Sequence, residues 1–570
     1  MTLFDFDRVP FSRHQRFTTL SMMCGQDDEQ RCYLRYVAGG DERPSLGRLC
    51  KLEFLSKDGT VLTPQFTLSP HRLDVDLFSN ERKQGYVSFC IGEGELLHIK
   101  GQGVLLKFTL EGSRYDYAFQ HPNGDQCIVA AGENLRLTPF TTAGDAVVEG
   151  NWRRDHADNV SLIFSGEQFE GGIILHRRLC PEVEKQSFEE AQATSRQAFF
   201  NWHGKQDQSE AEQLATYLLW ANTVPAEGAL THPSTYMSKN HMINIWSWDN
   251  AFSAIGLAGI DPDLAFSQFA AIFDWQDDSG LLPDFVHDAG ASFAFTKPPV
   301  HGWALLHIFE AYRDCFNSEQ LVYLRDKMER QLSYWLTHTR ASEQELPSYF
   351  HGNDSGWDNA SFFDHGGPVV GPDLPTFLCL TATCIARLYR TSEDPNTASK
   401  FDYVSKQMKD LMINQLWNGK TFDFRKPAQP NLVLPDTSLA QFMPLLLGSD
   451  LPREIAGKLI ERFNTQGFLT EWGPATENPQ STYYEADGYW RGPIWAPTTL
   501  LIFDGLCRQG EIRLAHELAK RFMKTCEASG MAENFDALTG AGLRDKAFAW
   551  TSAVYLRFQN VLSKAQLTPA

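Results

Sequence analysis

The N-terminal part of the chain alternates apolar and polar residues with the period of a β-strand. Leu106, Phe108 and Leu110 fall on one side of such a segment, with polar residues between them. Turn signals separate the apolar segments at KDG 57–59, NG 123–124 and GG 171–172. Many short strands joined by tight turns are typical of two packed antiparallel sheets. The pattern predicts an N-terminal β-sandwich over residues 1–185.

After residue 185 the period of the apolar residues becomes that of an α-helix. Residues 186–206 are rich in Glu, Ala, Gln and Arg and predict a helical linker. Beyond it, apolar residues recur every three or four positions, most clearly at 214–221, 321–335, 377–389, 401–411, 455–463 and 514–522. This spacing predicts about twelve helices between 208 and 563. Short turns alternate with long loops between them, which favours a toroid of six helical hairpins over residues 207–570.

Composition excludes several classes of partner. The net charge of −20 argues against nucleic acid, because phosphate binding needs clustered Lys and Arg. Eleven cysteines without a CxxC pair favour neither a disulfide framework nor a structural zinc site. The N-terminus carries early charges, unlike a signal peptide, and no apolar run reaches the roughly 18 residues that span a bilayer. We therefore expect a cytoplasmic protein without a membrane partner.

Four loops are rich in acids, amides and aromatic residues. They are NIWSWDNAF at 244–252, HGNDSGWDNASFFDHGG at 351–367, STYYEADGYWRGPIW at 481–495 and MAENFDALTGAG at 531–542. Loops longer than about 12 residues are usually functional. Carboxylates and arginines hydrogen-bond sugar hydroxyls, and aromatic rings pack against the apolar face of a sugar. The loops therefore predict a carbohydrate site.

Cutting a glycosidic bond requires two carboxyl groups, one that donates a proton and one that is ionised. Asp358 directly follows Trp357 in an aromatic loop, where burial would raise its pKa and suit it to the acid role. Glu533 follows a helix that is expected to end near Gly530, and its short loop could hold it facing a water. We expect these two residues to be the catalytic pair.

Other interpretations of these motifs stay open from the residues alone. Asp249 could cap the helix that starts near residue 250, Asp358 and Glu533 could be turn residues, and the turn at 491–493 could be structural. The chain could also be a non-catalytic sugar-binding protein. A metal site or a sugar epimerase would instead use four histidines in the same region, although their spacing fits no metal motif; these are His287, His301, His351 and His365.

In their order along 208–563, the four motifs resemble clan G of the glycoside hydrolases, most closely family 63 and more distantly the trehalases of family 37. WSWD at 246–249 is similar to a family segment that contacts the sugar. DSGWDNAS at 354–361 resembles the segment that carries the general acid. GYWRGPIW at 488–495 resembles a segment that lines the sugar subsite, and AENFDALTG at 532–540 resembles the segment with the general base. Phe535 departs from the tyrosine common in that segment.

The resemblance implies a mainly α protein whose (α/α)6 barrel carries the site, inversion at the anomeric carbon, and no cofactor or metal. It places the general acid on Asp358 and the general base on Glu533. The implied substrate-binding residues are Trp246, Trp248, Asp249, Asp354, Gly356, Trp357, Tyr489, Arg491 and Trp495.

The expected activity is exo-acting release of glucose from a small α-glucoside, either a disaccharide or a glucosylated solute. The partner is then a small carbohydrate, with neither nucleic acid nor membrane involved. Inversion predicts carboxyl groups about 6.5–9.5 Å apart, which leaves room for a water. The linkage, the aglycone, glucose against mannose at the cleaved position, the oligomeric state and the role of the N-terminal domain stay open.

Overall fold

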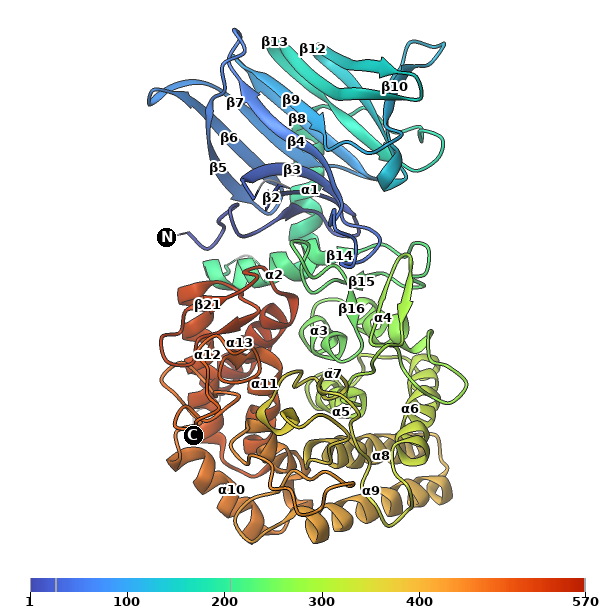
Figure 1. The fold of residues 1–570 in the computed structure, drawn as a ribbon, viewed down its shortest axis with the longest axis vertical. Coiled ribbons are helices and arrows are strands. Elements are labelled where there is room, and N and C mark those ends of the chain that lie inside the picture. The colour runs from blue at the N-terminus through green and yellow to red at the C-terminus, as the bar shows by residue number, and fades with distance from the viewer. Residues whose placement is uncertain (1, 26–27, 206, 568–570) are drawn as a thin grey trace. The chain divides into compact units, whose positions relative to one another are not determined.

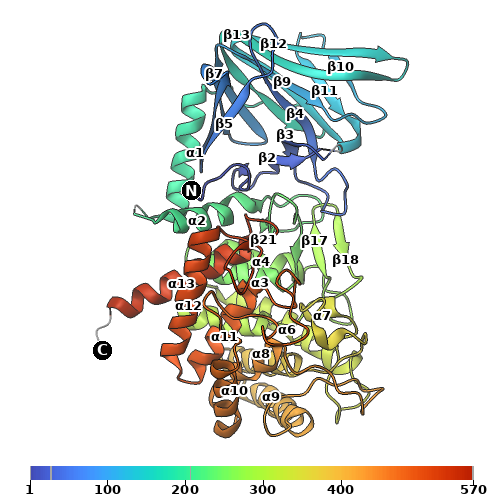
Figure 2. The ribbon, with the colours of Figure 1, turned by 60° about the vertical axis from the view of Figure 1, so that its left-hand side comes forward.

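A computed structural model of the chain describes residues 2–25, 28–205 and 207–567. The chain forms two compact units (Figures 1 and 2). The first comprises residues 1–208, 220–225 and 238–243, and the second comprises 209–219, 226–237 and 244–570. No helix among the described residues is both long and apolar enough to cross a bilayer.

The first unit is built on one antiparallel sheet. Its strands are β1 Phe11–Ser12, β2 Thr18–Cys24, β3 Gln30–Tyr36, β4 Arg48–Leu55, β5 Thr63–Ser69, β6 Arg72–Ser79, β7 Arg82–Ile91, β8 Leu96–Gln102, β9 Leu105–Leu110, β10 Tyr117–Gln120, β11 Gln126–Ala130, β12 Leu135–Arg153 and β13 His156–His176, with the short helix η1 at Ala131–Glu133. The strand order is β1-β2-β3-β4-β9-β13-β8-β7-β6-β5, and β10-β11-β12 branch from β13. The long strand β13 pairs with β9 near one end and with β8 near the other.

The predicted β character of this region is confirmed, but one predicted turn is wrong. The NG turn does join β10 to β11, whereas Gly171 and Gly172 lie inside β13. A Cβ on Gly171 would lie 2.1 Å from the carbonyl oxygen of Phe140, and one on Gly172 would lie 2.5 Å from that of Leu97. These glycines therefore allow close approach of neighbouring strands, a role that glycine also has inside sheets.

The predicted helix after the sheet is confirmed as α1, Phe188–His203. The Ser187 side chain accepts a hydrogen bond from the amide of Glu190, and the Glu190 carboxylate accepts one from the Ser187 amide. This capping box fixes the start of the helix. Phe188 and Ala191 then pack against Cys90 of β7, so α1 lies against the sheet (Figure 2).

The second unit is mainly helical, as predicted. Its helices are α2 Glu210–Asn222, which also reaches into the first unit, α3 Asp249–Leu257, α4 Pro262–Phe273, α5 His301–Ala311, α6 Ser318–His338, α7 Gly352–Ser355, η2 Ser361–Phe363, α8 Asp373–Thr391, α9 Pro395–Leu416, η3 Leu439–Asp450, α10 Arg453–Thr465, α11 Ala496–Arg508, α12 Ile512–Ser529 and α13 Ala549–Leu567. Short strands lie between them: β15 Ser234–Thr235, β16 Ile245–Trp246, β17 Phe285–His287, β18 Gly290–Ser292, β19 Ile494–Trp495, β20 Asn534–Phe535 and β21 Gly542–Leu543; β14, Thr223–Val224, belongs to the first unit. The six apolar groups singled out in the sequence fall in α2, α6, α8, α9, α10 and α12.

Helix contacts in the second unit run round a closed ring (Figure 1). Helix α3 packs on α5, α5 on α8, α8 on η3, η3 on α11, α11 on α13, and α13 returns to α3. The helices α4, α6, α9, α10 and α12 each pack on one or more members of this ring. The long loops between the helices carry all four of the motif segments.

Glycines allow three of the ring contacts to be close. A Cβ on Gly256 of α3 would lie 2.6 Å from the Cα of Ala553 in α13, and a Cβ on Gly302 of α5 would lie 2.4 Å from the Cα of Thr381 in α8. In α11, a Cβ on Gly505 would lie 3.0 Å from the Cβ of Leu445 in η3. Any larger residue at the first two positions must push whole helices apart.

The first prediction concerns these helix contacts. Gly256→Ala and Gly302→Ala should each destabilise the protein by about 1–3 kcal/mol, the usual cost of overpacking a core. The measurement is the free energy of unfolding in urea. Gly457→Ala is the matched control, because Gly457 is exposed on α10 with no atom near its added Cβ. It should be stabilising by about 0.5–1 kcal/mol. Equal effects at all three positions would contradict close packing of the ring.

Candidate active site

The loop that carries Asp358 is folded by its own acid and glycine. Asp354 accepts hydrogen bonds from the amides of Phe350 (3.1 Å), His351 (2.9 Å) and Thr296 (3.2 Å). Gly356 has a φ of 73°, and a Cβ there would lie 2.6 Å from the Trp248 ring. The structure therefore uses Asp354 and Gly356, both expected to bind substrate, to shape the turn between α7 and η2 in which Asp358 lies.

Asn359 and Arg491 join this loop to the segment 488–495. The Asn359 side chain donates to the carbonyl of Gly488 and accepts from the amide of Trp490, each at 3.0 Å. Arg491 Nε donates to the carbonyl of Asn359 at 2.7 Å, and its guanidinium forms an ion pair with Asp364. Arg491, which was expected to bind sugar hydroxyls, thus cross-links two loops.

Glu533 is held by backbone and indole hydrogen bonds. Its amide donates to the carbonyl of Asp545 at 2.8 Å, and Trp550 Nε1 donates to its carbonyl at 3.3 Å. The next residue, Asn534, pairs with Trp495 where β20 meets β19. The helix before it, α12, ends at Ser529 with Gly530 as its C-cap, close to the expected position. Glu533 therefore lies on a fixed backbone next to the segment that Asn359 and Arg491 hold.

Five tryptophans form a buried cluster under these loops, which we call the tryptophan cluster. Trp490 stacks on Trp495 with centroids 4.1 Å apart and planes at 6°, and also contacts Trp248 and Trp357. Trp550 meets Trp495 edge-on at 5.4 Å. Each is at most 3% exposed. The cluster therefore excludes water and lowers the local polarity, rather than forming an open stacking surface.

Two of the remaining expected binding residues lie at the edge of the buried region. Trp246 is half-buried on β16, with its ring 5.9 Å from that of Phe285. Tyr489 is also half-buried, and it meets Trp495 edge-on at 4.9 Å. Its φ of 62° is rare for a residue with a side chain, and such strain is often retained at functional sites.

Asp249 is the first residue of α3 and is 5% exposed. The interpretation of Asp249 as a simple helix cap is wrong, because the N-cap is Trp248 and no side chain caps the helix. Burial raises the pKa of Asp249 well above its usual value, while Lys297 opposes that rise and Asp358 adds to it. Asp249 is therefore electrostatically part of the same site as Asp358.

The proposed catalytic carboxyls both have raised pKa values. Burial raises the pKa of Asp358, and Lys297 and His351 oppose the rise. Burial, with a contribution from the neighbouring carboxylate of Asp545, raises the pKa of Glu533 to about 8, and Asp358 contributes to the rise. The two groups are thus close enough to influence each other, and at neutral pH the pair retains a proton.

Several residues of the site were not expected from the sequence. Lys297 lies between β18 and α5, with Nζ 3.2 Å from Asp284 and 4.0 Å from Asp358. The guanidinium of Arg544 lies 4.9 Å from the centre of the Tyr489 ring and opposes the pKa rise of Glu533. Both basic residues are isolated in the sequence, so no motif marked them. Trp490 lies within the segment 488–495 but was not singled out, and Trp550 lies outside the four motif segments.

The four histidines are distributed over different elements. His301 is buried on α5, where burial lowers its pKa to about 4. His287 lies on β17, His351 caps the start of α7, and His365 is exposed beyond η2. Across the described ranges, no three His, Cys, Asp or Glu side chains are placed so that they could hold a metal. The arrangement gives the histidine interpretation no support.

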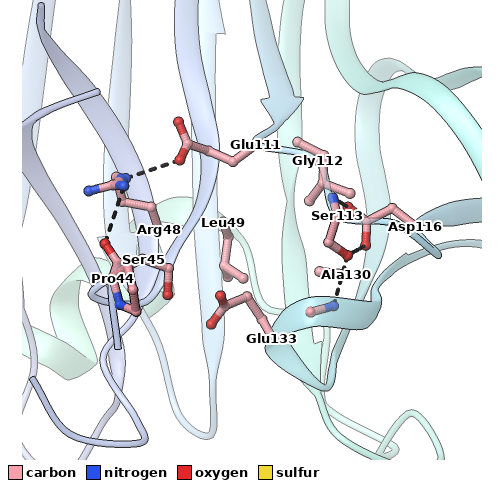
Figure 3. Close-up of a pocket in the computed structure, with 12 residues that line it drawn as sticks. Pro44, Ser45, Arg48, Leu49, Glu111, Gly112, Ser113, Asp116, Ala130 and Glu133 are labelled. Atoms are coloured by element: carbon pink, nitrogen blue, oxygen red, sulfur yellow. Dashed lines mark hydrogen bonds and ion pairs between the residues drawn. The ribbon is translucent and has the colours of Figure 1, made fainter. Parts of the chain in front are cut away.

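A cavity of about 350 Å³ lies in the first unit (Figure 3). Its charged groups bind one another or the backbone: Arg48 pairs with Glu111 at 3.0 Å, and Asp116 accepts from the amide of Ala131 at 2.7 Å and from the hydroxyl of Ser113 at 2.6 Å. These carboxylates therefore stabilise the turns of the first unit, in contrast to the buried acids of the second unit.

Comparison with known proteins identifies the family. Residues 242–551, more than half of the chain, match the model described as the mannosylglycerate hydrolase MGH1-like glycoside hydrolase domain. The chain belongs to this family. It is an O-glycoside hydrolase related to family 63, as the resemblance predicted.

Relatives named as hydrolases match more than half of this glycoside hydrolase. A mannosylglycerate hydrolase of Rubrobacter radiotolerans is 24% identical over 406 residues, which are 55% of this chain and 89% of the relative. A glucosylglycerate hydrolase of Mycolicibacterium hassiacum is 24% identical over 60% of this chain and 96% of the relative. The crystal structure of the family 63 mannosylglycerate hydrolase from Thermus thermophilus in complex with Tris superposes with a TM-score of 0.54 at 20% identity, over 61% of this chain and all of that chain.

The second prediction tests the cross-link between the loops. Asn359→Ala removes both hydrogen bonds to the segment 488–490 and should lower the rate of glycoside hydrolysis by about 100-fold, because small misplacements of a catalytic group have costs of that order. Asn418→Ala is the matched control: Asn418 also binds backbone amides of its loop, at Lys420 and Thr421. The control should alter the unfolding temperature without altering the rate. Equal rates for both variants would contradict a role for Asn359 in placing Asp358.

Proposed function

We propose that the protein is an inverting, exo-acting glycoside hydrolase that cuts a small α-glycoside, with Asp358 as general acid and Glu533 as general base. The observation that carries this proposal is a pair of carboxyls on loops of the helical unit, the half-buried Asp358 and the buried Glu533, whose pKa values are both raised. Paired carboxyls with perturbed pKa values are typical of glycosidase sites. The closed ring of contacts supports an (α/α)6 barrel for residues 207–570. The antiparallel strands likewise support a β-sandwich for residues 1–185, with 186–206 as the linker.

The proposed substrate is an α-linked glucoside or mannoside of a small solute, with a glycosylglycerate as the first candidate. The named activities of the relatives, mannosylglycerate and glucosylglycerate hydrolysis, support this class. Glucose-containing disaccharides such as trehalose are the next candidates. Asp249, Trp246 and Tyr489 are proposed to contact the sugar.

The proposed reaction is a single displacement. Asp358 transfers its proton to the glycosidic oxygen while the bond from that oxygen to the anomeric carbon breaks, and the oxygen keeps the bonding electrons. A water attacks the anomeric carbon from the opposite face, and Glu533 takes the proton of that water. The released sugar then has the inverted configuration. Carboxyls about 6.5–9.5 Å apart would allow this water between them.

Which of the two carboxyls holds the proton matters for the roles of Asp358 and Glu533. A pKa of about 8 leaves Glu533 mainly protonated at neutral pH, whereas Lys297 favours ionised Asp358. The reactive form in the proposal has the shared proton on Asp358 instead. The two forms contain the same number of protons, so a pH profile reports the pair and does not distinguish them. A substrate whose leaving group departs without a proton can distinguish the two roles, because it needs the base and does not need the acid.

The experiment that tests the function follows the anomer released by the purified protein in proton NMR. The substrates are mannosylglycerate, glucosylglycerate, trehalose, kojibiose, nigerose, maltose and sucrose. An α-glycoside should give the β sugar first. If the α sugar appears first, inversion is wrong. If no glycoside is cut although the protein is folded, the sugar-binding or epimerase interpretation replaces the proposal.

The third prediction assigns the two roles. Asp358→Asn and Glu533→Gln should each lower the hydrolysis of the best glycoside by about 100-fold to 10,000-fold, the range for general acid and base catalysis. With an α-glycosyl fluoride, whose leaving group needs no proton, Asp358→Asn should recover most of its rate, whereas Glu533→Gln should not. Recovery by the Glu533 variant alone would reverse the assignment. The measurement is the initial rate of fluoride release.

The fourth prediction concerns pH. The pair must hold a single proton to react, so kcat/KM should fall when the pair gains a second proton at low pH and when it loses its only proton at high pH. Because burial raises the pKa of Glu533 to about 8, the alkaline limb should lie near pH 8. An alkaline limb near pH 5, as for exposed carboxyls, would contradict the buried pair. The measurement is kcat/KM from pH 4 to 10 in buffers of constant ionic strength.

A further inference from the structure

Lys297 lies close to Asp358 and is buried, with 7% of its side chain exposed, whereas 26% of the Asp358 side chain is exposed. Its ammonium donates a hydrogen bond to the carbonyl of Asn353 at 2.9 Å and pairs with Asp284 at 3.2 Å. The Oδ1 atom of Asp358 lies 4.0 Å from the same nitrogen. A buried lysine with these partners is fixed in place, unlike a surface lysine, whose ion pairs contribute little.

We propose that Lys297 is the positioning residue for the general acid: it faces Oδ1 of Asp358, leaves Oδ2 to carry the transferable proton, and stabilises the carboxylate that forms when the proton leaves. This inference rests on the proposed function. It adds a residue outside the four motif segments to the same site.

Two sets of contacts fix the position of Lys297. Asp284 is 5% exposed, and its backbone is fixed because its amide donates to the carbonyl of Ser292 at 2.8 Å and its carbonyl accepts from the amide of Ser247 at 2.9 Å. On the other side, the amide of Thr296 donates to Asp354, which folds the Asp358 loop. The backbone before Lys297 and the loop that carries Asp358 are therefore joined directly, so their spacing is set by the fold.

Most of the other titratable groups around Asp358 are acidic, so the positive charge of Lys297 has a distinct role. Carboxyls face the site from Asp249 and Asp284, and Glu533 and the phenol of Tyr489 are also close enough to interact electrostatically. His351 is the other basic group that opposes the rise in the pKa of Asp358. Although burial favours neutral lysine, the surrounding carboxylates raise the pKa of Lys297, so it remains an ammonium.

The chemistry of the acid step gives this ammonium its effect. When the glycosidic bond breaks, Asp358 passes from a neutral acid to a carboxylate, and a fixed positive charge stabilises the negative charge that develops. The same charge opposes protonation of the carboxylate, so Asp358 becomes a stronger acid. A leaving group that departs without a proton gains nothing from this interaction.

The fifth prediction compares Lys297→Met, which removes the charge and the hydrogen bonds, with Lys297→Gln, which removes the charge but keeps a hydrogen-bond donor. With the glycoside substrate, kcat should fall at least about 10-fold in both, a part of the full contribution of a general acid. With the glycosyl fluoride, it should change less than about 3-fold, because that leaving group needs no proton. The acid limb of kcat/KM should move to higher pH, because loss of a cation raises the pKa of a carboxyl. Lys297→Arg should recover part of the rate.

Lys426→Met is the matched control. Lys426 is also buried, and its ammonium binds the carbonyls of His365, Gly366 and Gly367 in the loop beyond Asp358. Because those partners are uncharged, the control should lower the unfolding temperature and leave the acid limb in place. Equal losses on both substrates for the Lys297 variants, or an unmoved acid limb, would overturn the inference. The proposed function is tested separately by the Asp358→Asn variant. If this variant is inactive on the glycoside and active on the fluoride, the proposed function stands although the inference on Lys297 is wrong.

Discussion

Two hydrogen bonds made by the Asn359 side chain connect the proposed acid to the proposed base. They attach the residue after Asp358 to Trp490, 131 positions away in the sequence. Trp490 stacks on Trp495, and Trp495 pairs through the backbone with Asn534, the neighbour of Glu533. Because every link is a short hydrogen bond or a close ring contact, the distance between the two carboxyls is determined by the fold. Catalysis that needs a water between two acids depends on such a fixed distance.

The same cluster that sets this distance also sets the acidity of the site. The tryptophans lie in or beside the loops that carry the carboxyls, and desolvation by burial is the largest cause of the raised pKa values of Asp358 and Glu533. Leaving several carboxyls in a poorly solvated region costs stability. The helical ring offsets this cost with an extensive core, in which glycines such as Gly256 and Gly302 let the helices approach closely. Stability is therefore concentrated in the ring, and the strained or electrostatically unfavourable groups lie in its loops.

The sequence predicted elements whose two faces differ and missed features that depend on close packing. Amphipathic helices such as α6, α9, α10 and α12 show an apolar stripe, whereas α5 is buried on nearly all sides and has no stripe to detect. The start of α3 was expected near residue 250 from its motif, and not from a stripe. Gly171 and Gly172 resembled a turn because glycine marks turns and close strand contacts alike. Asp358 and Glu533 stood out because they lie in dense motifs. Lys297 did not, because its importance comes from partners at 284, 353 and 358 that only the fold brings together. The domain boundaries and the residue roles remain predictions.

The acidic residues of the motif loops fall into two groups that differ in their contacts. Asp354 accepts three backbone hydrogen bonds, Asp364 pairs with Arg491, and Asp536 accepts the amides of Leu538 and Thr539. These contacts shape the loops. Asp249 and Glu533 are instead buried and Asp358 is half-buried, and all three have raised pKa values, so their hydrogen bonds and ion pairs do not compensate for desolvation. A fold retains such uncompensated acids where a proton has to move, because a carboxyl that is fully stabilised as an anion would neither give nor share one at neutral pH.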